Sequence, residues 1–129
     1  MTRRTHMATT DLEWARASDV MPGFAALDDT DAGVFVKVLR RPDDGGDCWH
    51  WLIRFVPPEG RAIRVTAVAE SDEETFYFTN PGPKCEGVYG CNPAGLRHGV
   101  TLTEETVALV HYHGAPDRIV RAEIVETTQ

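Results

Sequence analysis

The sequence predicts an all-β protein that folds as a single domain, a jelly-roll-like barrel of two packed sheets. Short runs in which apolar and polar residues alternate recur along the chain, and clusters rich in Gly, Pro, Asn and Asp separate them. Helical patterning is almost absent. The 129 residues suffice for one hydrophobic core. We therefore expect the barrel over residues 21–129 and a short N-terminal arm over residues 1–20.

The first third of the chain predicts mixed local structure. We expect residues 11–20 to form one or two helical turns anchored by Trp14, because Met21-Pro22-Gly23 then breaks the pattern. Residues 24–31 read as a short strand followed by a turn rich in Asp.

The rest of the chain reads as strands separated by turns. The segment from Cys48 to Val56 indicates a strand with one buried face. One face carries Trp49, Trp51, Ile53 and Phe55, and the other carries His50, Leu52 and Arg54. By the same reasoning, further strands are expected over residues 33–39, 63–68, 74–78, 99–102, 107–113 and 119–125.

The segment from Gly87 to His98 predicts a strand, a sharp turn and a second strand. Gly87 allows a positive φ, Pro93 ends the first strand, and Gly95 frees the backbone to reverse. His98 then opens the next strand with its side chain on one face. The alternative interpretation is a β-hairpin with an incidental histidine.

Charge and composition exclude several classes of partner. The formal net charge is −7 and the isoelectric point is near 5.1, so a nucleic-acid partner is not expected. No run of about 18 apolar residues is present, so we expect no membrane span. The odd number of cysteines and the lack of a visible secretory signal favour the cytoplasm, with Cys85 and Cys91 as structural residues.

The spacing Gly-x5-Pro-x-Gly-x2-His at residues 87–98 resembles the second motif of the cupin superfamily, in which the histidine binds a metal inside a small barrel. The first cupin motif is altered: Gly60 is present, but Thr66 and Val68 stand where it has two histidines. Glu73 matches the glutamate of that motif, and Asn80 replaces its last glycine. The order of segments over residues 24–114 is similar to the anti-sigma-factor cupin domain and the acetylacetone-cleaving dioxygenases.

This resemblance implies a small molecule or a metal inside the barrel. Of the four usual ligands, His98 and Glu73 remain, and a tightly held transition metal usually needs at least three. We therefore expect no metal and no cofactor. If a metal binds, His98, Glu73 and His111 are the candidate ligands.

Strand alternation then suggests which side chains line the interior. If Thr66 and Val68 occupy the ligand positions, Arg64 shares their face, and Thr75 and Tyr77 share the face of Glu73. We expect acid/base and charge-stabilising roles for His98, Glu73, Arg64 and Tyr77. The expected substrate-binding residues are Thr66, Val68, Thr75, Val100, His111 and His113. For Arg64 and for the pair His111 and His113, a solvent-facing position stays open as the alternative.

Small stand-alone cupins that resemble this chain often serve secondary metabolism. We therefore expect a metal-independent cyclase, isomerase or dehydratase that acts on a polyketide-like intermediate. The alternatives are a metal-dependent cupin dioxygenase and a non-catalytic small-molecule-binding or sensor module. A homodimer is expected, because open sheet edges need cover.

Overall fold

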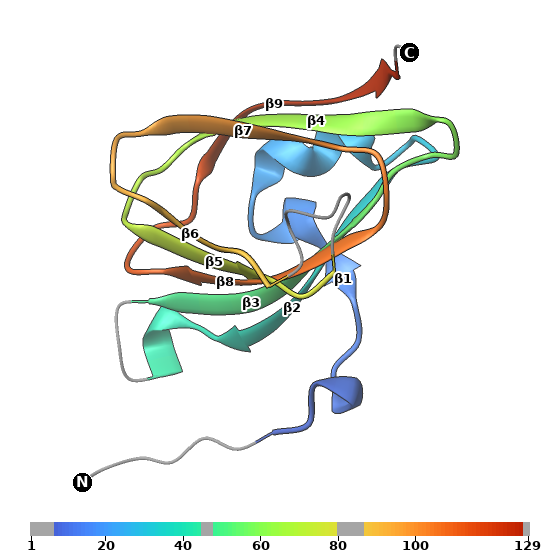
Figure 1. Ribbon diagram of the computed structural model, residues 1–129. Helices are drawn as coiled ribbons and strands as arrows, with labels where there is room; N and C mark the ends of the chain where they lie inside the picture. The colour runs from blue at the N-terminus through green and yellow to red at the C-terminus, as the bar shows by residue number, and fades with distance from the viewer. Residues whose placement is uncertain (1–6, 45–47, 80–86, 128–129) are drawn as a thin grey trace, which may run out of the picture.

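The computed structural model describes residues 7–44, 48–79 and 87–127 and contains two antiparallel sheets that face each other (Figure 1). The larger sheet has six strands in the order β1-β2-β3-β8-β5-β6. These strands are β1 (Ala15–Arg16), β2 (Gly33–Arg40), β3 (Trp49–Val56), β8 (Thr106–Tyr112), β5 (Glu73–Tyr77) and β6 (Tyr89–Asn92). The smaller sheet has the order β7-β4-β9, formed by β7 (Arg97–Leu102), β4 (Arg61–Val68) and β9 (Arg118–Glu126).

The predicted all-β double-sheet architecture is confirmed. Over the described ranges no ladder of hydrogen bonds joins the two sheets, so they form a sandwich and not a continuously closed barrel. No helix in these ranges is long and apolar enough to cross a membrane. Asn80, expected to replace a motif glycine, and Cys85, expected to be structural, lie outside the described residues.

The core lies between the sheets and follows from the alternation in the strands. In β3, Trp51, Ile53 and Phe55 point inward and are buried, while His50 and Arg54 lie on the outer face. The same pattern holds in β8, where every second residue from Thr106 to Tyr112 is buried. The predicted two-faced strand over residues 48–56 is therefore confirmed.

Two predictions for the N-terminal third are wrong. Residues 24–31 do not form a strand, because Pro22–Leu27 is a 3₁₀ helix, η3, that buries Phe24 and Leu27. Pro22 suits the first helical position, and a spacing of three places both side chains on one face of a 3₁₀ turn. The helical turns expected over residues 11–20 reduce to one 3₁₀ turn, and Trp14, their expected anchor, lies outside it. These residues contain β1, which pairs with β2, and the short 3₁₀ helix η2 (Ala17–Asp19). Two other 3₁₀ turns are η1 (Thr9–Asp11) and η4 (Pro42–Asp44).

The segment from Gly87 to His98 carries the chain from one sheet to the other. β6 pairs with β5 in the large sheet, whereas β7 pairs with β4 in the small sheet, so the two strands do not form a hairpin with each other. The positive φ angles expected at Gly87 and Gly95 are confirmed, at 72° and 90°. The turn at Pro93 and Gly95 therefore delivers His98 to the small sheet, facing the large one.

Candidate functional site

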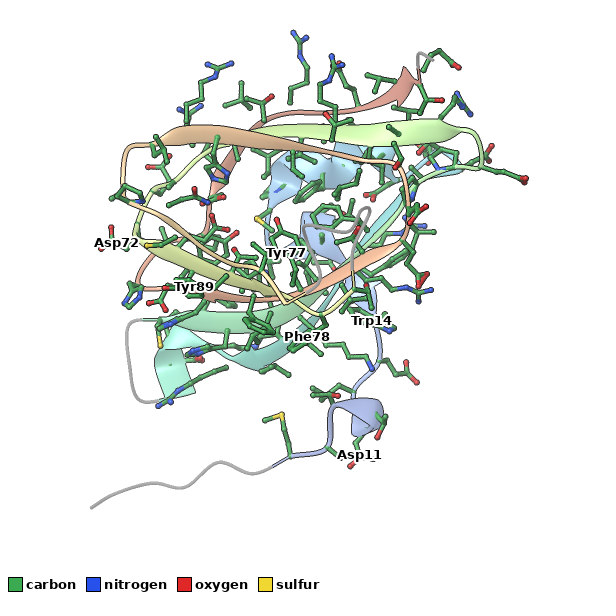
Figure 2. All side chains as sticks on the ribbon, viewed as in Figure 1. Asp11, Trp14, Asp72, Tyr77, Phe78 and Tyr89 are labelled. Carbon is green, nitrogen blue, oxygen red and sulfur yellow. The ribbon has the colours of Figure 1, made fainter. Side chains whose placement is uncertain are left out.

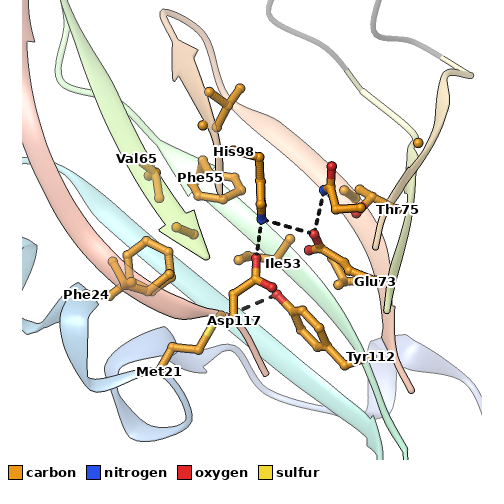
Figure 3. Close-up of a pocket in the computed structure, with 18 of the residues that line it drawn as sticks. Met21, Phe24, Ile53, Phe55, Val65, Glu73, Thr75, His98, Tyr112 and Asp117 are labelled. Carbon is orange, nitrogen blue, oxygen red and sulfur yellow. Dashed lines mark hydrogen bonds and ion pairs between the residues drawn. The ribbon is translucent and has the colours of Figure 1, made fainter. Parts of the chain in front are cut away.

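A cavity of 270 Å³ lies between the two sheets (Figure 3). Its walls are mostly apolar and come from the inner faces of both sheets and from η3. The apolar part of the lining comprises Met21, Phe24, Ile53, Phe55, Val65, Ala67, Val100, Ala108, Val110 and Ile119. The polar part comprises Glu73, Thr75, Tyr77, Asn92, His98, Tyr112 and Asp117. The site is thus a small apolar chamber with a polar cluster in one wall.

Three ionisable side chains form that cluster, each from a different part of the chain. His98 belongs to β7, Glu73 begins β5, and Asp117 precedes β9. His98 Nε2 lies 2.8 Å from Asp117 Oδ2 and 3.5 Å from Glu73 Oε1, as the dashed lines in Figure 3 mark. Both carboxyl groups are buried, with relative exposures of 6% for Glu73 and 7% for Asp117. One imidazole therefore faces two buried carboxylates.

Strand register explains how Glu73 is held in this position. Glu73 lies opposite Asn92 on β6 and opposite Tyr112 on β8, so all three side chains share the inner face of the large sheet. Asn92 Nδ2 donates a hydrogen bond to Glu73 Oε1 at 2.7 Å. Asn92 and Tyr112 thus fix the carboxyl group from its two flanking strands.

The environment shifts the pKa values of the cluster in a consistent direction. The close contact with the Asp117 carboxylate raises the pKa of His98; burial opposes this, and the charges of Asp117 and Glu73 add to it. Burial, followed by the negative charge of Asp117, raises the pKa of Glu73, against the hydrogen bond from Asn92. Burial also raises the pKa of Tyr112 well above its usual value, so its hydroxyl stays protonated. His98 therefore favours its protonated form, and Glu73 is a stronger base than an exposed glutamate.

Two atoms of the cluster are buried without an aligned hydrogen-bond partner in the described part of the chain. These atoms are Nε2 of His98 and Oδ1 of Asp117. The 2.8 Å contact between His98 and Asp117 has a hydrogen-bonding length, but its direction is poor for a hydrogen bond. Buried polar atoms are rarely left in this condition, so the cluster has capacity for a ligand atom in the cavity.

The structure brings half of the predicted site residues to the cavity. Its lining includes His98, Glu73, Thr75, Tyr77 and Val100. Tyr77 lines the cavity, whereas its neighbour Phe78 is 46% exposed; both are labelled in Figure 2. The chemical roles given to these residues stay predictions.

The predicted face of β4 is wrong. Arg64, Thr66 and Val68 do not line the cavity; Val65 and Ala67 do. Arg64 is exposed on the outer face, with Nη1 3.7 Å from Glu123 Oε1. Because successive side chains in a strand point to opposite faces, alignment to the first cupin motif placed the strand one residue out of register.

Of the two positions left open for His111 and His113, the structure shows the outer one, so their expected role in substrate binding inside the cavity is not supported. Neither lines the cavity, because Val110 and Tyr112 occupy the inner face of β8. His111 lies on the outer face beside His50, so it does not join the cluster of Glu73 and His98 as a metal ligand.

Asp117 is the carboxylate of the cluster that sequence reasoning missed, and Asn92 and Tyr112 beside Glu73 were not predicted either. Asp117 follows Gly114-Ala115-Pro116, which predicts a turn, and an aspartate in a turn is normally exposed. The only feature of the sequence that could have indicated a buried Asp117 is its position just before a strand, and this is weak evidence.

Asp117 also changes the expectation for a metal. One ligand atom each from Glu73, His98 and Asp117 lie within 4.8 Å of one another. One imidazole and two carboxylates suit a divalent cation that prefers oxygen and nitrogen ligands, such as Mn²⁺ or Fe²⁺. Asp117 therefore adds a third ligand atom to the two that remain of the usual cupin set, and the donor set of this cluster fits a metal.

No protein-family model matches the sequence, and the search of curated proteins gives no significant match. Solved structures are similar in fold. A candidate acetylacetone dioxygenase from Methylibium petroleiphilum PM1 has a TM-score of 0.62 at 14% identity, with 94% of this chain and 83% of that chain covered. An acetylacetone dioxygenase from Acinetobacter johnsonii has a TM-score of 0.58 at 12% identity, covering 97% and 87%.

The polyketide cyclase RemF from Streptomyces resistomycificus is also similar, with a TM-score of 0.56 at 17% identity. That match covers 100% of this chain and 87% of RemF. These neighbours are cupin-fold proteins, so the expected cupin fold is confirmed. At these identities the similarity establishes the fold alone.

Proposed function

We propose that this protein is a cupin-fold enzyme that transfers protons on a small 1,3-dicarbonyl substrate, and so cyclises, isomerises or dehydrates a polyketide-like intermediate. The observation that carries the proposal is the position of His98, which lies beside two buried carboxylates in the wall of an apolar cavity. Ionisable groups with shifted pKa values in a concave apolar site are typical of active sites.

His98 and Glu73 supply an acid and a base for one reaction. His98, with its raised pKa, donates the Nε2 proton to a carbonyl oxygen of the substrate. Glu73, whose pKa is also raised, accepts a proton from the adjacent carbon and so forms an enol. The enol carbon can then attack a second carbonyl group, which forms the new ring bond. In this step the enol oxygen returns its proton to His98 as its carbonyl re-forms, and Glu73 gives its proton to the new alkoxide. Proton uptake and release balance within the pair.

Asp117 holds His98 in its acid form, and Asn92 orients Glu73. Asp117 lies closer to Nε2 than Glu73 does, at 2.8 Å against 3.5 Å, so it is the main counter-ion of the imidazolium. Tyr77 forms part of the cavity lining, whereas Arg64 lies on the outer face, away from a bound substrate.

The size of the cavity favours a small substrate or one reactive part of a longer chain. Its 270 Å³ lies near the lower end, about 300 Å³, of ordinary ligand pockets. Structural neighbours named for acetylacetone and for polyketide cyclisation support the substrate class, because acetylacetone is a 1,3-diketone and polyketide intermediates repeat the same unit.

The test uses chelator-treated protein with short poly-β-keto thioesters, and mass spectrometry detects cyclised or dehydrated products. We expect H98A to lower turnover by about 10²–10⁴-fold, the usual contribution of a general acid. H98Q, which keeps hydrogen bonding without carrying a proton, should behave like H98A. R64A, on the outer face, is the matched control and should keep full activity. Full turnover in H98Q would leave His98 an orienting role and refute the acid assignment.

A metal-dependent cupin oxygenase is the second candidate, because Asp117 completes a set of three ligands. Glu73, His98 and Asp117 would hold the ion, which would supply Lewis-acid or oxygen chemistry. The chain's own residues would still shape the apolar cavity that excludes water. Calorimetric titration with Mn²⁺ distinguishes the two candidates: tight binding that is lost in D117N, with activity restored by the metal, favours the oxygenase. Full activity of chelated protein favours the acid/base enzyme.

A further inference from the structure

A second group of ligand-type side chains lies on the outer face of the large sheet, away from the cavity. The group, here called the outer histidine cluster, consists of Cys48, Glu74, His50, His111 and His113. β3 and β8 pair with His50 opposite His111, and β5 and β8 pair with Glu74 opposite His111. Three neighbouring strands thus gather these side chains at one place. The proposed reaction uses none of them.

The side chains of the cluster are in close contact. The His50 and His111 rings are stacked with their centroids 3.9 Å apart, and the His111 and His113 rings lie 4.2 Å apart. Cys48 Sγ lies 4.0 Å from His50 Nδ1. Cys48, His50 and His111 are all half-buried. Three imidazoles and a thiol therefore lie together on the outer face of the large sheet, which is a set of side chains typical of a ligand-binding site.

The environment lowers the pKa values of two of these imidazoles. Burial lowers the pKa of His50, and the nearby His111 lowers it further. Burial likewise lowers the pKa of His111, with a contribution from His113.

We infer that Cys48, His50 and His111 form a binding site for a zinc-type divalent cation on the outer face of the large sheet. Their ligand atoms lie within 4.8 Å of one another. Tetrahedral zinc, with bonds of about 2.0–2.3 Å, places its ligand atoms about 3.3–3.8 Å apart. Rotation of the imidazoles about χ2, a broad torsion, can close the gap. Three protein ligands leave one position open for water or another ligand.

The neighbouring trio of Glu74, His111 and His113 also meets the distance condition, but it fits less well. His113 Nε2 is already paired with Glu74 Oε1 at 2.7 Å, and these side chains are 47% and 38% exposed. The trio of Cys48, His50 and His111 fits better, because thiolate and imidazole are the preferred zinc ligands. The negative charge of Glu74 near His111 also favours a cation at this trio.

Cobalt(II) tests the site, because a thiolate bound to cobalt gives a charge-transfer band in the near ultraviolet. We expect reduced, full-length protein to bind Co²⁺ with this band and with tetrahedral visible bands, and Zn²⁺ to displace it. C48A and C48S should abolish the charge-transfer band. H50A and H111A should weaken Co²⁺ binding by at least about tenfold. Circular dichroism verifies that each variant is folded; Cys48 precedes β3, so its replacement leaves the ladder intact.

Two variants serve as controls. H113A removes the neighbouring trio, and D117N alters the cluster in the cavity; both should keep the thiolate band and its affinity. Absence of the band in the unaltered protein would overturn the inference. A band that persists in C48S, or cobalt binding that is lost in H113A but kept in H50A, would overturn it as well.

Discussion

Glu73 is a residue whose ionisation opposes folding. Folding buries its carboxyl group near Asp117 and raises its pKa, so the folded state holds its proton to a higher pH than the unfolded chain does. The favourable contribution of the protonated form is therefore complete below the unfolded pKa, and it is lost as pH rises through the folded pKa. Above the folded pKa, the ionised group destabilises the fold.

We therefore predict that E73Q is more stable than the unaltered protein at pH 8 and that this advantage shrinks as pH falls to 4. Gln has the same shape, removes the repulsion with Asp117, and can still accept the hydrogen bond from Asn92. Urea unfolding at several pH values measures the difference. N92A, which removes only that hydrogen bond, should instead be destabilised by about 0.5–1.5 kcal/mol. A stability difference for E73Q that does not change with pH would contradict this account.

At the scale of elements, the close approach of β7 to β4 places His98. A Cβ atom at Gly99 would lie 2.7 Å from the Val65 carbonyl oxygen, in the next strand. We predict that G99A destabilises the fold by about 1–3 kcal/mol, as overpacking usually does. G90A, whose added Cβ would meet nothing within 4 Å, is the matched control. Thermal unfolding compares the two variants, and equal midpoints would show that β7 tolerates displacement.

The alternation of apolar and polar residues predicted most strands, because one face of each strand is buried. It did not always predict which face of a strand points into the cavity. In β4 the inner positions follow from apolar Ile63 and Val65, yet the motif spacing placed Thr66 inward. The pattern also missed η3, because a 3₁₀ turn of six residues leaves little periodic signal. His98 and Glu73 were found because they lie in motifs. Asp117 was not, because its burial depends on contacts that only the folded sandwich creates.

At the scale of the whole molecule, two groups of ligand-type side chains lie on opposite faces of the large sheet. The inner faces enclose an apolar cavity with an acid/base cluster, while the outer face of the large sheet carries the outer histidine cluster. The corrected position of His111 places it in the second group. We predict that substitution in one cluster leaves the other unchanged: H111A should keep the activity of the cavity within about twofold, because sites without shared partners act independently. A large loss of turnover in H111A would show that the two faces are coupled.

The central claim, proton transfer by His98 and Glu73, can be measured without knowing the substrate. An aryl methyl ketone in deuterated water exchanges its methyl protons slowly near neutral pH, and nuclear magnetic resonance follows the exchange directly. We predict that chelator-treated protein accelerates this exchange and that R64A does so equally. E73Q and H98A should lose the acceleration by about 10²–10⁴-fold. Exchange no faster than in buffer, or full acceleration in E73Q, would contradict the account.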